Sequence, residues 1–213
     1  HQIWEIPWDS NSAKEGEYHP TPGRELLKAL SNYWSPLPLI AEDLGAVTKA
    51  SLALRDEFAL PGMRVLQFAF DPTLEDFEIH RPENYPLNCV AYSGTHDNNT
   101  LSGYLDNISL EEQAELHLYL NPEESAEAKR SNKQIVKSLL TRLLNSQAAQ
   151  VIIPVQDFIG LAGTARINLP GSSNDNWQWR LSQDHVATLQ QKSGQIHQMI
   201  RDSHRPKQEG GRR

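Results

Sequence analysis

Short apolar runs recur along the chain, and each is followed by polar or glycine-containing sequence. They occupy residues 37–41 (LPLIA), 63–70 (MRVLQFAF), 89–92 (CVAY) and 151–155 (VIIPV). Runs of this length are typical of parallel strands, because such strands are covered by helices on both faces of their sheet. The pattern therefore predicts four buried parallel strands.

Between these runs, apolar residues recur at the spacing of amphipathic helices. The spacing predicts helices at about residues 22–34, 47–58, 109–120, 123–145 and 183–202. Ser109 and Glu112 have the spacing of a capping box, which marks the start of one of these helices. Strands that alternate with helices indicate one α/β layer system, and the polar residues 201–213 predict a disordered tail.

Acids and amides collect where the apolar runs end. They are Glu42, Asp43, Gln67, Asp71, the residues HDNN at 96–99, Gln156 and Asp157. An open doubly wound sheet and a (β/α)8 barrel are both built from such units, and both bind ligands at the carboxyl ends of their strands. We therefore expect these polar residues to form one functional face.

Charge and composition limit the classes of molecule that this face is expected to bind. The net charge of -7 argues against a nucleic-acid partner and is compatible with a neutral ligand such as a sugar. The single cysteine, Cys89, excludes an internal disulfide framework and indicates a reducing compartment. No apolar run approaches membrane-spanning length and no signal peptide is visible, so a soluble globular protein without a membrane partner is expected.

Two of the strand-end acids, Glu42 and Asp97, are the kind of pair that acetal chemistry uses. One carboxyl group protonates the leaving oxygen, while another stabilises or attacks the developing oxocarbenium ion. His96 and the asparagines beside it supply hydrogen bonds to sugar hydroxyls.

Other interpretations of these residues remain open. Asp43 is able to cap the helix expected from residue 47. His96 and Asp97 are residue types of metal sites, although no second cluster shows ligand spacing such as HExxH. Together with Ser93 they also have the residue types of a hydrolase triad, but no GxSxG elbow is present.

Six strings occur in order along the chain, and together they resemble one known family. They are LIAEDLG at 39–45, PGMRVLQFAF at 61–70, SGTHDNNT at 93–100, QDFIGL at 156–161, ARIN with PG at 165–171, and NWQWR at 176–180. The set is similar to the 4-α-glucanotransferases, also called amylomaltases or disproportionating enzymes, of glycoside hydrolase family seventy-seven. The resemblance runs from about Trp4 to Arg180, which is most of the chain.

The resemblance implies the (β/α)8 TIM barrel of the α-amylase clan, with the four apolar runs as strands five to eight. Residues 1–200 are then expected to form the C-terminal half of the barrel, and the missing N-terminal half is the expected partner. The chain starts HQIWEIP, within an aromatic and apolar segment, which we interpret as a cut end. The family's nucleophilic aspartate, in a motif like RIDH at the end of strand four, is expected upstream and outside this chain.

The resemblance also assigns roles to residues of two strings. Glu42 in AEDLG matches the general acid/base, Asp97 in THDN matches the transition-state-stabilising aspartate, and His96 matches a histidine that contacts the sugar. Asn98 and Asn99 are expected at the rim of the same subsite. Relatives commonly carry aspartate where Asn99 stands, so this chain has one charge fewer near the site.

Further positions are assigned by the same comparison. Gln67 and Asn168 are candidates for lining the substrate site. From residue type alone, Trp177 and Trp179 are interpreted as packing residues of the barrel wall in preference to sugar platforms, and Arg166 and Arg180 as structural partners of acidic residues.

The activity that the resemblance implies is transfer of α-1,4-glucan segments between maltooligosaccharides by a retaining double displacement. It needs no metal and no organic cofactor. Two alternatives stay open: an α-glucan hydrolase of the same clan, and a catalytically inactive truncated barrel with at most glycan binding. A cytoplasmic protein is expected, or a plastid protein if the source is a plant or alga.

Overall fold

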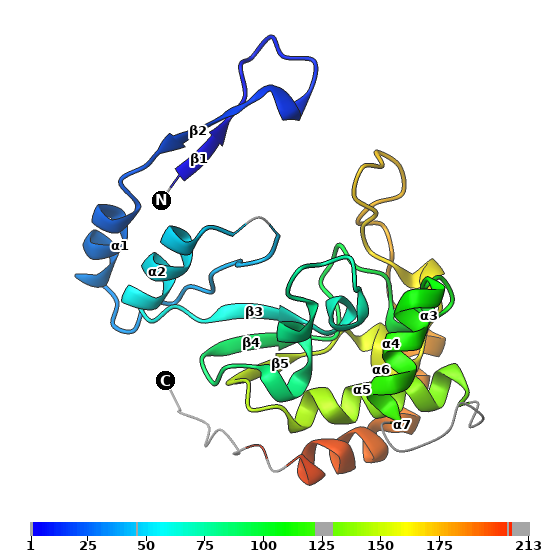
Figure 1. Ribbon diagram of the computed structural model, residues 1–213. Coiled ribbons are helices and arrows are strands. Elements are labelled where there is room, and N and C mark those ends of the chain that lie inside the picture. The colour runs from blue at the N-terminus through cyan, green and yellow to red at the C-terminus, as the bar shows by residue number, and fades with distance from the viewer. Residues whose placement is uncertain (1, 46, 122–129, 204, 206–213) are drawn as a thin grey trace. The chain divides into compact units, whose positions relative to one another are not determined.

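The computed structural model describes residues 2–45, 47–121, 130–203 and 205. The chain divides into two compact units, His1–Met63 and Arg64–Arg213, and each is described by itself (Figure 1).

The first unit begins with a β-hairpin that the apolar pattern did not predict. Strand β1 (Gln2–Glu5) pairs antiparallel with β2 (Glu17–Pro20). The Trp4 indole packs edge-on against Tyr18 at 4.8 Å between ring centroids and donates a hydrogen bond to the Ala13 carbonyl at 2.7 Å. A Cβ at Gly16 would lie 2.6 Å from the Trp4 ring, so this close approach requires glycine.

Two predicted helices of this unit are confirmed. Helix α1 spans Gly23–Ser31, and α2 spans Lys49–Glu57. The Thr48 hydroxyl caps α2 by accepting from the Ser51 N–H at 3.1 Å. An ion pair of 2.8 Å between Arg24 and Glu57 joins the two helices.

The strand predicted at residues 37–41 is wrong, because this segment is irregular. Among the described residues, the backbone of this segment is joined to another segment by one hydrogen bond, in which the Ala41 N–H donates to the Pro61 carbonyl at 2.8 Å. Pro36 and Pro38 lack the N–H that a regular ladder needs. Leu39 and Ile40 are 39% and 47% exposed, so the buried environment that the apolar pattern implied is absent within this unit.

The second unit is organised around a three-stranded sheet in the order β3-β4-β5. The strands are β3 (Gly62–Val65), β4 (Cys89–Tyr92) and β5 (Gln150–Ile152), and β4 and β5 run parallel, with Tyr92 opposite Ile152. Strand β4 confirms the predicted run 89–92, and its first three residues are buried.

Two apolar runs contain a strand but are not strands throughout. The run 63–70 leaves the sheet at Val65 and continues as a 3-10 helix, Leu66–Phe70, with four of its five residues buried. The run 151–155 ends its strand at Ile152, and Pro154 precedes the short helix α6 (Val155–Ile159). An apolar run that is buried on every side does not reveal whether it is strand or helix, which is why both predictions extended too far.

The described residues of this unit also form further α-helices. They are α3 (Leu101–Leu105), which the pattern missed, α4 (Leu110–Leu120), α5 (Asn132–Asn145) and α7 (Gln183–Asp202). The capping box of Ser109 and Glu112 at the start of α4 is confirmed. Short 3-10 helices lie at Phe77–His80, Pro82–Asn84 and Gly163–Ala165, and another, Ala13–Glu15, lies in the first unit.

Helix α5 is shorter than the predicted helix 123–145. It begins at Asn132, where the Ser131 hydroxyl and the Gln134 side chain form a capping box, and residues 122–129 lie outside the described residues. The predicted apolar face of α5 is confirmed, since Leu139 and Leu143 are fully buried. They join Phe70, Cys89 and residues of α4 in one hydrophobic cluster.

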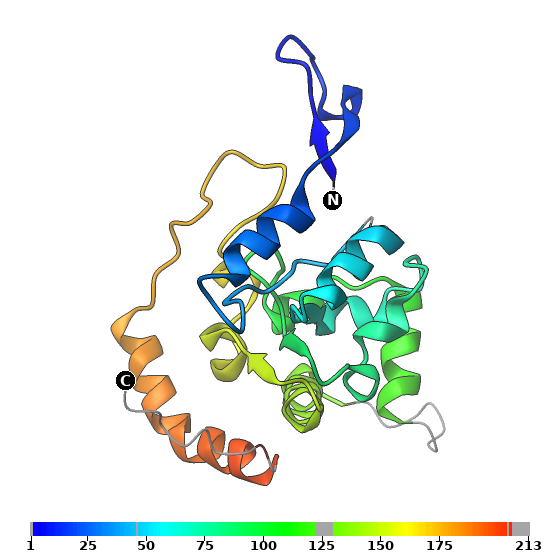
Figure 2. The same ribbon diagram turned by 90° about the vertical axis from the view of Figure 1, so that its left-hand side faces the viewer.

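Helix α7 follows a long connection from residue 166 to residue 182, which Figure 2 shows as an extended path between α6 and α7. Of the tail predicted at residues 201–213, Arg201 and Asp202 are the last residues of α7. The Arg205 guanidinium donates to the carbonyls of Leu144, Ser146 and Ala148, each at 2.8 Å. Residues 204 and 206–213 lie outside the described residues. None of the helices in the described ranges combines the length and apolarity that a bilayer crossing requires.

Candidate active site

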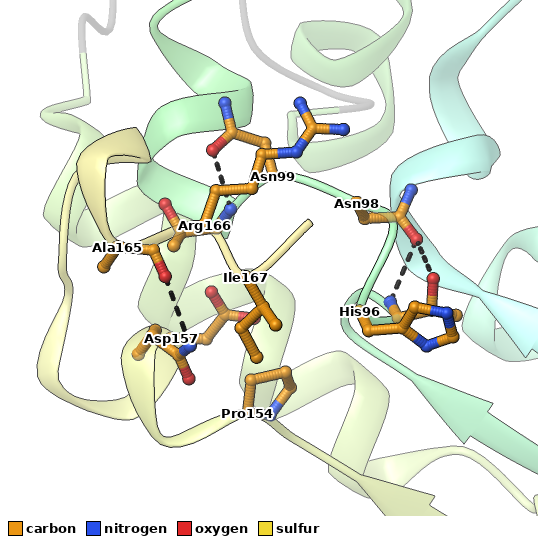
Figure 3. A pocket seen from close by; sticks show the side chains of 11 residues that line it. His96, Asn98, Asn99, Pro154, Asp157, Ala165, Arg166 and Ile167 are labelled. Atoms are coloured by element: carbon orange, nitrogen blue, oxygen red, sulfur yellow. Dashed lines mark hydrogen bonds between the residues drawn. The ribbon is translucent and has the colours of Figure 1, made fainter. Parts of the chain in front are cut away.

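A pocket in the second unit lies at the carboxyl end of β4 (Figure 3). Its walls come from the loop after β4, from α6 and the residue before it, and from the start of the long connection. The lining residues are 95, 96, 98–100, 154, 156, 157 and 165–167. Several of the polar residues that the sequence predicted at strand ends therefore line one pocket of this unit.

The loop of residues 95–100 is folded by its own polar side chains. The Asn98 side-chain oxygen accepts from the Thr95 N–H at 2.9 Å and from the Thr95 hydroxyl at 2.8 Å. The Thr100 hydroxyl accepts from the Gly103 N–H at 3.0 Å and caps α3. These bonds turn the loop so that His96 and Asp97 are its outward residues, with side chains 54% and 49% exposed.

Contacts of Gln67 and Asn99 hold the end of this loop in place. The Gln67 side chain is 5% exposed, and its amide donates to the Asn99 carbonyl at 2.7 Å. The Asn99 side chain accepts from the Thr100 N–H at 2.9 Å. It is packed against Gly103, where a Cβ would lie 2.5 Å from the Asn99 side-chain oxygen, so the close contact requires glycine.

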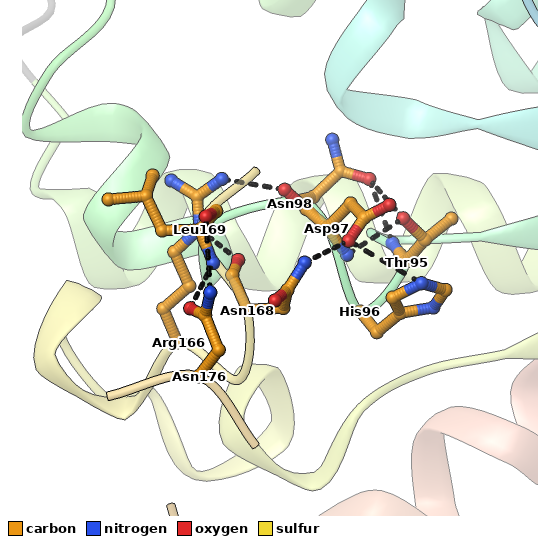
Figure 4. Close-up of polar contacts among 8 residues, drawn as sticks. All are labelled: Thr95, His96, Asp97, Asn98, Arg166, Asn168, Leu169 and Asn176. Carbon is orange, nitrogen blue, oxygen red and sulfur yellow. Dashed lines mark hydrogen bonds and ion pairs between the residues drawn. The ribbon is translucent and has the colours of Figure 1, made fainter. Parts of the chain in front are cut away.

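Asp97 is oriented by a second segment, residues 166–168 (Figure 4). The Asn168 side-chain amide donates to Asp97 Oδ1 at 2.5 Å, and His96 Nε2 lies 3.4 Å from the same oxygen. The Arg166 guanidinium donates to the Asp97 carbonyl at 2.6 Å and to the Asn168 carbonyl at 2.8 Å. Arg166 thus ties the two segments together through carbonyl groups.

Sequence reasoning missed this role of Arg166. It predicted that the guanidinium pairs with acidic side chains, but the bonds go to backbone oxygens. One feature of the sequence could have indicated this role: Arg166 lies in the ARIN string, two residues before the predicted site residue Asn168. Asn168 was predicted to line the substrate site, and the structure places its amide on the Asp97 carboxylate.

Asp157 is a buried acid of the pocket lining, with 3% of its surface exposed. It accepts from the Ser93 hydroxyl at 2.6 Å and from the Leu101 N–H at 2.7 Å, and so joins the end of β4 to the start of α3. Burial raises the pKa of the Asp157 carboxyl group, and the two hydrogen bonds oppose this rise. Asp157 therefore has a structural role within the pocket lining.

Replacing Asp157 with alanine is expected to lower the free energy of unfolding by about 3 kcal/mol, because it leaves two buried donors unpaired. D157N keeps an acceptor for Leu101, and the Ser93 hydroxyl is able to reverse, so a loss of ~1 kcal/mol is expected. The raised pKa means that the folded state holds this proton more tightly than the unfolded state. Stability is therefore expected to fall as the pH rises from the ordinary carboxyl pKa through the raised one, and D157N removes this contribution. Urea unfolding measures both effects, and a D157A stability equal to that of the wild type contradicts the structural role.

Glu42 belongs to the first unit, so its surroundings are described there. Its side chain is exposed, whereas the Asp43 side chain is 5% exposed. Asp43 accepts from the Met63 N–H at 2.6 Å and from the Arg55 guanidinium, and a Cβ on Gly62 would collide with its carboxylate. Asp43 does not cap α2, whose cap is Thr48. It anchors the segment from which Glu42 projects.

The structure therefore gathers most of the predicted site residues in the second unit. These are His96, Asp97, Asn98, Asn99, Gln67 and Asn168. Among the residues that the structure describes, no group of three or more His, Cys, Asp or Glu side chains is arranged to hold a metal ion. The His96 imidazole and the Asn98 amide line the pocket, and the oriented Asp97 carboxylate lies next to them in the same loop.

Comparison with known protein families gives a match over most of the chain. The model of the family described as 4-alpha-glucanotransferase matches residues 1–186. A 4-alpha-glucanotransferase of Synechocystis is 40% identical over 185 residues, which are 86% of this chain and 35% of that protein. One of Thermus thermophilus is 38% identical over 193 residues, which are 87% of this chain and 38% of that protein. The chain thus spans little more than a third of the length of these relatives.

Solved structures give the same picture. The amylomaltase from Streptococcus agalactiae in complex with acarbose has a TM-score of 0.83 and 28% identity, over 96% of this chain and 39% of that one. The amylomaltase from Corynebacterium glutamicum has a TM-score of 0.67 at 16% identity, over 95% of this chain and 34% of that one, which shows likeness of fold.

Proposed function

Because this chain belongs to the 4-α-glucanotransferase family, we propose that it supplies the acid/base and the stabilising carboxylate of an enzyme that transfers α-1,4-glucan segments between maltooligosaccharides. The observation that carries the proposal is the exposed Asp97 carboxylate, oriented by Asn168 and adjacent to His96, which lines the pocket. The names of the relatives support it, as does the acarbose complex of the similar amylomaltase.

We further propose which strands of the barrel this chain contains. We assign the strands β3, β4 and β5 to strands six to eight of a (β/α)8 barrel. The N-terminal half of that barrel is then the partner of this chain. A cytoplasmic location, or a plastid one in a plant or alga, is part of the same proposal.

Asp97 acts in this mechanism on the sugar ring at the point of cleavage. As the glycosidic bond breaks, the ring flattens and positive charge develops at C1 and the ring oxygen. A carboxylate that binds the ring hydroxyls most tightly in this geometry lowers the barrier more than it strengthens substrate binding. The Asn168 amide and the Arg166 guanidinium hold the loop so that the carboxylate is already placed. His96 and Asn98 donate to sugar hydroxyls beside it.

Glu42 acts as general acid and then as general base. It gives its proton to the glycosidic oxygen while the nucleophilic aspartate attacks C1, so that the C–O bond breaks and a covalent glucosyl-enzyme forms. It then removes the proton of an incoming sugar hydroxyl, which attacks C1 and displaces the aspartate. The resemblance places this aspartate outside the 213 residues, and therefore the 213-residue chain alone is expected to be inactive, with at most glucan binding.

The test is incubation of the full-length gene product with maltotriose, followed by chromatography of the products. Glucose together with maltodextrins longer than maltotriose is expected. Glucose and maltose without elongation would instead identify a hydrolase of the same clan.

A further inference from the structure

Trp177 lies at the rim of the pocket, although the sequence favoured a packing role for it. Its ring is tilted by 37° against the His96 imidazole, with 5.1 Å between the ring centroids. Its backbone N–H donates to the Ile167 carbonyl at 2.8 Å. Since His96 and Ile167 both line the pocket, Trp177 is held directly beside the lining.

The indole is presented to solvent by a constrained backbone. Trp177 is 56% exposed and has a φ of 64°, a left-handed conformation that is unfavourable for a bulky residue. Two neighbours hold it there. The Arg180 guanidinium donates to the Trp177 carbonyl at 2.8 Å, and the Asn176 side chain accepts from the Leu169 N–H at 2.8 Å. The loop thus maintains an unfavourable conformation that leaves a large apolar face uncovered.

The indole N–H is also available to a ligand. Within the described part of the chain it has no hydrogen-bond partner, whereas the indole of Trp4 donates to the Ala13 carbonyl. A pyranose ring has an apolar face of C–H groups, which packs on the electron-rich face of an indole, and hydroxyls at its edge that accept from an N–H.

We propose that Trp177 is a stacking platform for a glucose ring of the α-glucan chain, next to the ring that contacts His96 and Asp97. This inference rests on the proposed function, whose site it extends along the sugar chain. The ring contact with His96 places the indole beside the imidazole to which the proposed function gives a sugar hydroxyl.

The matched control is Trp179, two residues along the same connection. Its ring stacks on His185 of α7 at 22° and 5.8 Å, so that its face is used within the protein. W177G removes the platform and also relieves the left-handed backbone, because glycine adopts that conformation readily. W177F keeps a smaller aromatic face. The loss of one stacking contact corresponds to roughly a fivefold to tenfold effect on binding.

The experiment measures kcat and KM for maltotriose in the full-length gene product, together with the thermal midpoint of each variant. For W177G we expect a KM about tenfold higher, an unchanged kcat, and a midpoint equal to or above that of the wild type. For W177F we expect a smaller rise in KM, and for W179A no rise. A ring that only packs would give the opposite result for W177G: a lower midpoint with unchanged KM.

The outcomes separate the two proposals. A wild type without transfer or glucan binding overturns the proposed function and the platform together. An active wild type in which W177G has the same KM as W179A overturns the platform alone.

Discussion

Replacing Glu42 with glutamine in the full-length gene product is expected to lower kcat on maltotriose by about a thousandfold, with glucan binding largely retained. Glutamine has nearly the shape of glutamate, but it neither donates a proton to the glycosidic oxygen nor accepts one from the incoming hydroxyl. Because the Asp43 anchor is untouched, the backbone around residue 42 is expected to stay in place.

A maltosyl fluoride donor makes this test specific. Fluoride leaves without protonation, so E42Q is expected to retain much of its rate in the first step, and azide as acceptor removes the need for a base in the second. Fluoride release measures the rate. The matched control is E25Q, an exposed glutamate of α1 in the same unit, which is expected to behave as wild type. A loss of equal size on both donors, or no loss on maltotriose, removes Glu42 from the acid/base role.

Replacing Asp97 with asparagine is the second change with a large expected effect, a fall in kcat of about 100- to 1,000-fold. The side chain keeps its shape and an oxygen that accepts from the Asn168 amide, so that the loop is expected to keep its conformation. What is lost is the negative charge that faces the developing positive charge on the sugar. KM for maltotriose is therefore expected to change little, since the charge acts mainly on the transition state.

The comparison variant for D97N is N168A, which leaves the carboxylate in place and removes its amide partner. A fall in kcat of roughly tenfold is expected there, because the charge remains but is less well positioned. Steady-state kinetics of both variants test the assignment. If N168A lost more activity than D97N, the amide and not the carboxylate would be the principal group at this position.

Sequence patterns predicted those elements whose signals are local. Helices α4 and α7 and strand β4 are confirmed at or near their expected bounds, because caps and periodicity mark their ends. The strand predicted at 37–41 failed, since Pro36 and Pro38 interrupt the donors that a ladder needs. The run 63–70 failed beyond Val65 because burial on all sides hides the difference between strand and 3-10 helix.

The position of the pocket was predictable from the sequence, whereas the contacts by which its residues hold the loop were not. The density of polar residues after β4 correctly located the pocket. The sequence did not show that the Asn98 side chain bonds to Thr95 within the loop, or that the Gln67 amide bonds to the Asn99 carbonyl. Both roles depend on contacts to backbone groups. The role of Arg166 was missed for the same reason. The sequence did not show that Trp177 is exposed or that its backbone is left-handed, because a tryptophan in a loop predicts neither.

Transfer of a labelled acceptor tests the central claim most directly. The full-length gene product is incubated with maltotriose and ¹³C-labelled glucose, and the products are separated and analysed by mass spectrometry and NMR. The account predicts label at the reducing end of newly formed α-1,4-linked maltodextrins, and loss of this incorporation in E42Q and D97N. Consumption of maltotriose with all label remaining as free glucose would contradict it.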